Sequence, residues 1–134
     1  MRHLSYRKFA AVLMVMLTFT LCIIKSPILA QTGGGGEETH NWAISLPFPD
    51  QDITRTSSVP GFGEAGKKND AYLFTVFYDG GNKSSSGMSS SNYTWAAEVD
   101  PPAGLGNKWP IGTGLVILFA EFETQDWVSV DFVN

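Results

Sequence analysis

After the first thirty residues, apolar residues concentrate in four segments, and their spacing predicts β-strands. Residues 71–78 (AYLFTVFY) and 115–122 (LVILFAEF) are apolar at nearly every position, as expected of strands covered on both faces. Residues 93–99 (YTWAAEV) and 127–133 (WVSVDFV) instead alternate, which is typical of a strand with one buried face. No segment after residue 30 keeps a helical apolar period over three turns, so the pattern favours an all-β fold.

The polar stretches between these segments predict the connections. Residues 79–82 (DGGN) have turn chemistry, and residues 123–126 (ETQD) read as a four-residue link that closes an antiparallel hairpin. Residues 50–70 and the serine-rich residues 83–92 lack apolar periodicity and are expected to be loops. We therefore predict one domain at residues 40–134, a small antiparallel β-sandwich or open barrel of four to six strands.

The N-terminus has the parts of a secretory signal peptide. Arg2, Arg7 and Lys8 are basic, residues 9–24 form an apolar run, and Ala30 offers a cleavage point. A membrane-spanning helix needs about 20 apolar residues, so cleavage is favoured over retention as an anchor. We expect the signal at 1–30 to be removed and 31–39 (QTGGGGEET) to be a flexible Gly-rich tether.

Removal of the signal changes the charge and chemistry of the product. The remaining chain has five basic and thirteen acidic residues, so its net charge is −8 where the whole chain has −4. Nucleic-acid binding rests on Lys/Arg contacts to phosphate, so no nucleic-acid partner is expected. Cys22 leaves with the signal and His40 is the one histidine left, which excludes disulfides and sites that need two imidazoles.

Three glutamates raise the question of glycoside hydrolysis, which needs two carboxyl groups across a cleft. Glu98, Glu121 and Glu123 each lie in or beside a predicted strand, and the last two are expected to share one face. Carboxylates that keep a sheet soluble are the simpler interpretation. A catalytic triad would have to use His40, which sits beside the tether and is poorly placed to be held as a base.

A structural calcium ion is the only cofactor that the composition suggests. Its oxygen ligands would come from Asp50 and Asp52, or from Asp70, Asp79 and Asn82. These residues form no recognised calcium-loop motif, and no cofactor is otherwise expected.

The candidate binding surface is formed by the predicted loops 79–92 and 103–113, at one end of the domain. Trp109, between Lys108 and Pro110 in a Gly/Pro loop, is the aromatic that we expect to be exposed. Tyr93, Asn82 and Lys108 complete the predicted set.

These features together favour a secreted or surface-exposed, non-enzymatic domain that binds a protein or glycan partner. The expected location is extracytoplasmic: the periplasm, the cell surface or the medium. Any membrane contact would come through the signal segment if it stayed uncleaved. Two alternatives stay open, a secreted toxin or bacteriocin-like effector and a small glycan-directed hydrolase with paired carboxylates.

Overall fold

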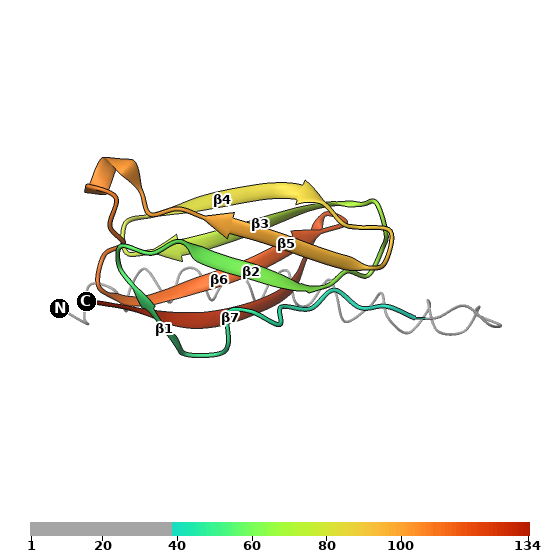
Figure 1. The fold of residues 1–134 in the computed structure, drawn as a ribbon, viewed down its shortest axis with the longest axis horizontal. Coiled ribbons are helices and arrows are strands. Elements are labelled where there is room, and N and C mark those ends of the chain that lie inside the picture. The colour runs from blue at the N-terminus through green and yellow to red at the C-terminus, as the bar shows by residue number, and fades with distance from the viewer. Residues whose placement is uncertain (1–38) are drawn as a thin grey trace.

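The computed structural model describes residues 39–134, which form seven strands in two sheets (Figure 1). The strands are β1 (Gln51–Thr54), β2 (Val59–Glu64), β3 (Ala71–Tyr78), β4 (Gly81–Met88), β5 (Thr94–Val99), β6 (Gly112–Ala120) and β7 (Glu123–Val133), with a short 3-10 helix η1 (Ala103–Leu105) before β6. The signal predicted at 1–30 and the tether up to residue 38 lie outside the described residues. Within 39–134, no helix is long and apolar enough to cross a membrane.

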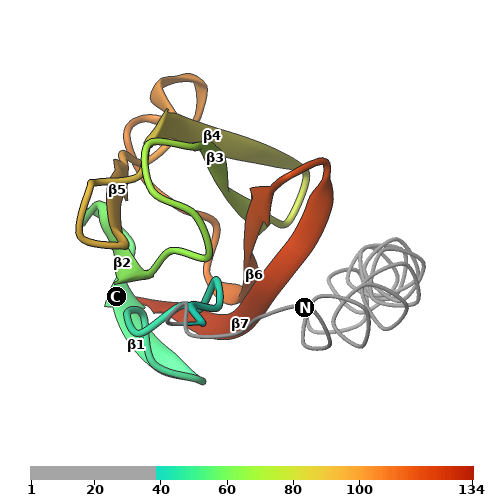
Figure 2. The ribbon, with the colours of Figure 1, turned by 90° about the vertical axis from the view of Figure 1, so that its right-hand side faces the viewer.

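The larger sheet has the strand order β1-β7-β6-β3-β4, and β2 pairs with β5 in the smaller sheet. The extended residues 43–46 continue the smaller sheet at β2, where Ser45 N donates to Phe62 O at 2.9 Å. The two sheets enclose one core (Figure 2). No described strand of one sheet is hydrogen-bonded to the other sheet, so the strands do not close into a ring.

The all-β prediction is confirmed, but the expectation of four to six antiparallel strands is wrong. Seven strands are present, and β1 runs parallel to the end of β7, with Ile53 opposite Phe132. Two of the three unpredicted strands, β1 and β2, lie in residues 50–70. In β2 glycine takes inward positions because little space remains there, and a Cβ on Gly61 would lie 2.5 Å from the Phe74 ring.

The serine-rich segment is also a strand rather than the predicted loop. β4 pairs with β3 along its whole length, and the turn at Asp79–Gly80 joins the two strands. Strand pairing needs backbone groups rather than apolar side chains, and the small residues of β4 fit against large neighbours. A Cβ on Gly87 would lie 2.6 Å from the Tyr72 hydroxyl.

Side chains from both sheets fill the core. Trp95 of the smaller sheet contacts Phe74 of the larger one, with ring centroids 5.4 Å apart. Its indole Nε1 donates to Ala43 O at 2.9 Å, so the polar atom of this buried ring is satisfied. The apolar faces predicted for β3, β5, β6 and β7 therefore meet as expected.

Candidate functional site

A two-residue turn, Glu121–Phe122, joins β6 to β7 and forms what we call the hairpin tip. Ala120 pairs with Glu123 across it, and φ is 54° at Glu121 and 62° at Phe122. Positive φ at both central residues is the type I′ pattern, which matches the twist of the two strands. The link predicted at residues 123–126 is wrong, because those residues begin β7.

The hairpin tip carries residues that this backbone conformation disfavours. The left-handed region costs a residue with a side chain about 1–2 kcal/mol, and Asn-Gly is the usual pair in such turns. Phe122 is also completely exposed, at 104% of its reference area. The turn thus exposes an aromatic ring to water although its backbone is strained. Residues with strained backbone conformations cluster at functional sites.

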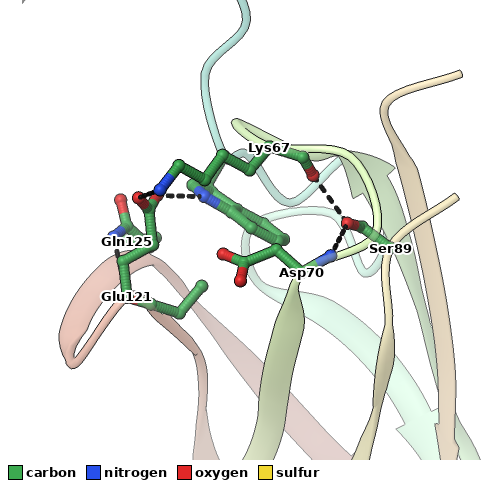
Figure 3. Close-up of polar contacts among 7 residues, drawn as sticks. Lys67, Asp70, Ser89, Glu121 and Gln125 are labelled. Carbon is green, nitrogen blue, oxygen red and sulfur yellow. Dashed lines mark hydrogen bonds and ion pairs between the residues drawn. The ribbon is translucent and has the colours of Figure 1, made fainter. Parts of the chain in front are cut away.

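Both carboxylate oxygens of Glu121 are bound. Trp42 Nε1 donates to Oε2 at 2.8 Å, and Lys67 Nζ lies 3.3 Å from Oε1 (Figure 3). The buried Ser89 hydroxyl donates to Lys67 O at 2.6 Å and accepts a hydrogen bond from Asp70 N at 2.9 Å. Side chains from two distant parts of the chain therefore hold the first residue of the hairpin tip, and Ser89 fixes the backbone beside one of them.

A β-bulge fixes the strands that lead to the hairpin tip. The β6–β7 register shifts between Leu118 and Phe119, which leaves Gln125 as the extra residue. The Gln125 side-chain amide donates to Ala120 O at 2.9 Å, across the hairpin. Asp126 Oδ2 accepts a hydrogen bond from Ile44 N at 2.7 Å and so ties β7 to the start of the domain. These contacts hold the ends of the two strands that the hairpin tip connects.

Trp109 is buried, so the prediction that it is exposed is wrong. Its exposed fraction is 0%, and its ring stacks on Phe132 with centroids 4.9 Å apart. Its Nε1 donates to Ser57 O at 2.8 Å, and its backbone N donates to Arg55 O at 2.8 Å. The loop folds back over the end of the core because these two backbone carbonyls provide partners for the tryptophan.

The four predicted ligand-binding residues do not come together. Asn82 and Lys108 are exposed. Asn82 pairs with Phe77 beside the turn between β3 and β4, and Trp109, next to Lys108, contacts Tyr78 at this turn. Tyr93 lies at the opposite end, near the hairpin tip, where its carbonyl accepts a hydrogen bond from Ala65 N at 2.9 Å. The predicted binding surface on loops 79–92 and 103–113 is divided as well, because β4 runs through the first range.

The predicted catalytic carboxylates are similarly separated along the fold. Glu121 lies in the turn and Glu123 begins the next strand, so they do not share a face of one strand as predicted. Glu98 is exposed on β5 of the other sheet, opposite Pro60. His40, in contrast to the expectation, is held in place: Nδ1 lies 2.9 Å from Glu64 Oε2.

The predicted calcium ligands of the second set do not assemble. Asp70 precedes β3 and Asp79 follows it, so the eight residues of the strand separate them by about 26 Å. Among residues 39–134, no three His, Cys, Asp or Glu side chains are grouped so that they could hold a metal ion.

The chain matches no protein-family model, no curated protein and no solved structure. Its function is therefore argued from the geometry of the hairpin tip.

Proposed function

We propose that the chain is a small exported β-sandwich, released by signal cleavage, that binds a protein partner through the hairpin tip. The exposed Phe122 on a strained and well-anchored turn carries this proposal. A domain that was selected only for stability would gain by placing glycine at this position, because glycine adopts positive φ without strain. The phenylalanine at this position is best explained if its ring contacts a binding partner.

The proposed use is insertion into an apolar pocket of the partner. Complete burial of a phenylalanine side chain contributes about 1.5–3 kcal/mol, which is the range of a residue that dominates an interface. The contacts of Glu121 with Trp42 and Lys67 hold the turn before binding. Less conformational entropy is then lost on association, so more of the burial energy appears as affinity.

A protein pocket fits the hairpin tip better than a glycan does. Sugar recognition combines ring stacking with hydrogen bonds from adjacent polar groups. Glu121 directly precedes Phe122, and both oxygens of its carboxylate already have partners within the domain. The Glu121 carboxylate is thus engaged within the domain and is not free for sugar hydroxyls.

Site-specific photo-crosslinking tests this proposal. A photoreactive phenylalanine analogue is placed at Phe122 in the exported protein, and a matched control carries it at Ile111. Ile111 is 51% exposed and lies before β6, at the other end of that strand from the hairpin tip. We expect one defined protein adduct from position 122 and none of the same mass from position 111.

Competition separates specific binding from chance contact. Excess unlabelled wild-type protein should remove the adduct, whereas a Phe122→Gly protein should not. The proposal fails if Phe122→Gly competes as well as wild type, or if both positions give the same adducts. Loss of the adduct on enzymatic deglycosylation of the target would assign the site to a glycan instead.

A further inference from the structure

Strand β4 is a free edge of the larger sheet. The strand order ends at β4, which pairs with β3 on one side only. Figure 1 shows β4 at the border of the ribbon, with no strand beyond it. It is also the one described strand without a buried residue, since its positions alternate between half-buried and exposed. This edge is therefore open to solvent on both faces of the sheet.

The register with β3 leaves half of the backbone groups of β4 unpaired. Just past the strand, Ser89 N donates to Asp70 O at 2.8 Å, so the odd-numbered residues of β4 exchange hydrogen bonds with β3. The N–H and C=O groups of the even-numbered residues point away from β3. No backbone hydrogen bond to these outward groups occurs within residues 39–134. The outward residues are all exposed: Asn82, Ser84, Ser86 and Met88.

β4 lacks the features that usually protect an edge strand from pairing with another chain. Protected edges are short, or carry proline, bulges or several charges. β1, at the other edge of the sheet, has four residues. β4 has eight residues without proline, and it pairs with β3 without a bulge. Its one charged side chain, Lys83, donates from Nζ to Pro101 O at 3.3 Å within its own domain. The edge is thus suited to pair with a further strand.

We propose that β4 pairs with β4 of a second copy across a two-fold axis, so that the two larger sheets become one. A two-fold axis perpendicular to the sheet makes this pair antiparallel. The register that uses every outward residue places Asn82 opposite Met88 of the second copy, and Ser84 opposite Ser86. Each of these pairs can exchange two backbone hydrogen bonds. This proposal does not depend on the hairpin tip or on its partner.

The side chains of β4 favour a second copy as the occupant of the edge. In the proposed register Ser85 lies opposite itself at the axis, and Lys83 lies opposite Gly87 of the second copy. No cross-strand pair therefore brings like charges together. β4 has no acidic residue, whereas residues 39–134 carry eleven acidic and five basic side chains. Two copies thus meet here with less like-charge repulsion than between surfaces that carry the acidic residues.

An interface of one strand from each copy predicts a weak dimer. Complexes that bury less than about 1,200 Å² in total are at the weak end of specific association. We therefore expect reversible association that depends on concentration. Sedimentation velocity of the exported protein, from low-micromolar to near-millimolar concentration, should show wild type shifting from monomer to dimer.

Two double variants test the register itself. Asn82→Lys with Met88→Lys places like charges opposite each other in the dimer, whereas Asn82→Glu with Met88→Lys places opposite charges there. We expect the like-charge variant to have a dissociation constant at least ten-fold higher than the opposite-charge variant. The like-charge variant also lowers the net negative charge of the chain, so repulsion between whole molecules would give the reverse order.

The matched control adds the same charge at the other edge of the sheet. Thr54→Lys with Thr56→Lys changes two exposed residues at the end of β1, and should not raise the dissociation constant above that of wild type. Circular dichroism of all three double variants should match wild type, because every substituted side chain is exposed. A photoreactive phenylalanine analogue at Ser86 of the otherwise unchanged chain should give an adduct of twice the mass of the chain.

Three results would overturn the proposal. One is a wild-type monomer at every concentration, and another is a like-charge variant that associates as well as the opposite-charge variant. The third is an adduct between position 86 and a different protein, which would assign the edge to a strand of that protein. Phe122→Gly should leave the dimer intact, so failure of this proposal and failure of the proposed function are distinguishable.

Discussion

Replacement of Trp109 by alanine should destabilise the domain strongly, because the ring is a core element and not a ligand contact. The ring is 0% exposed, stacks on Phe132 and packs edge-on against Tyr78. Removal of a buried tryptophan costs about 3–5 kcal/mol through lost burial and the cavity that remains. For the 96 residues described, total stability is about 5–14 kcal/mol, so this is a large share of it.

Two further variants separate the contribution of the buried ring from those of its hydrogen bond and of the loop. Trp109→Phe keeps a ring on Phe132 but leaves Ser57 O without its donor, and should cost about 1–3 kcal/mol. Ile111→Ala removes an exposed apolar side chain from the same loop and should change the stability by less than about 0.5 kcal/mol.

Urea unfolding followed by far-ultraviolet circular dichroism measures all three variants, since this probe does not depend on tryptophan emission. The slope with denaturant should stay constant while the midpoint falls in the order Ile111→Ala, Trp109→Phe, Trp109→Ala. The reasoning is refuted if Trp109→Ala loses less than about 1 kcal/mol. That result would mean that the ring is not packed in the core, and would restore Trp109 as a candidate for ligand binding.

Three further substitutions test other parts of the structure. Ser89→Ala removes the hydroxyl that binds two partly buried backbone groups, and should lower the free energy of unfolding by about 1–3 kcal/mol in a urea titration. Gly63→Ala would bring a Cβ into overlap with Ala43 O, so the edge formed by residues 43–46 should lose hydrogen-exchange protection before the core does. Phe122→Gly should raise the free energy of unfolding by about 1 kcal/mol, because glycine adopts positive φ without strain, and should remove partner binding. A lower free energy of unfolding would contradict the strain assigned to the turn.

The strands that sequence predicts well are those that carry their own apolar pattern. Residues 71–78 are dense in aromatic and β-branched side chains, and the strand has these same bounds. The 127–133 alternation likewise places Val128, Val130 and Phe132 in the core. In both segments the residues favour strand conformation and are also buried in the core, so the apolar pattern was sufficient to predict the strands.

Strands without an apolar pattern of their own, whose residue types depend on contacts with adjacent strands, could not be predicted from the sequence. The two glycines of β4 lie against Tyr78 and Tyr72 of β3, and nothing in the sequence of β4 itself indicates those contacts. The prediction for Trp109 failed for a related reason. Flanking Gly and Pro residues indicate a loop but do not tell whether the loop folds back onto the core.

The hairpin tip was missed because its sequence contradicts its conformation. Glu121 and Phe122 continue an apolar run, and neither residue favours a type I′ turn. The partners that hold Glu121 in place lie far away in sequence: Trp42 is 79 residues distant. A site that is built against local preference is visible only once the chain has folded.

The parallel pairing of β1 with β7 also determines when the domain can be completed. Gln51 pairs with Val130, so the first and last strands meet only after the 78 residues between them are available. Contacts at such separation form late, since the entropy of closing the intervening chain must be overcome first. For the exported chain proposed here, β1 would cross the membrane before β7 and would stay unpaired until β7 followed. The sheet would then be completed on the far side, and the chain would stay extended enough to be transported until its last strand had arrived.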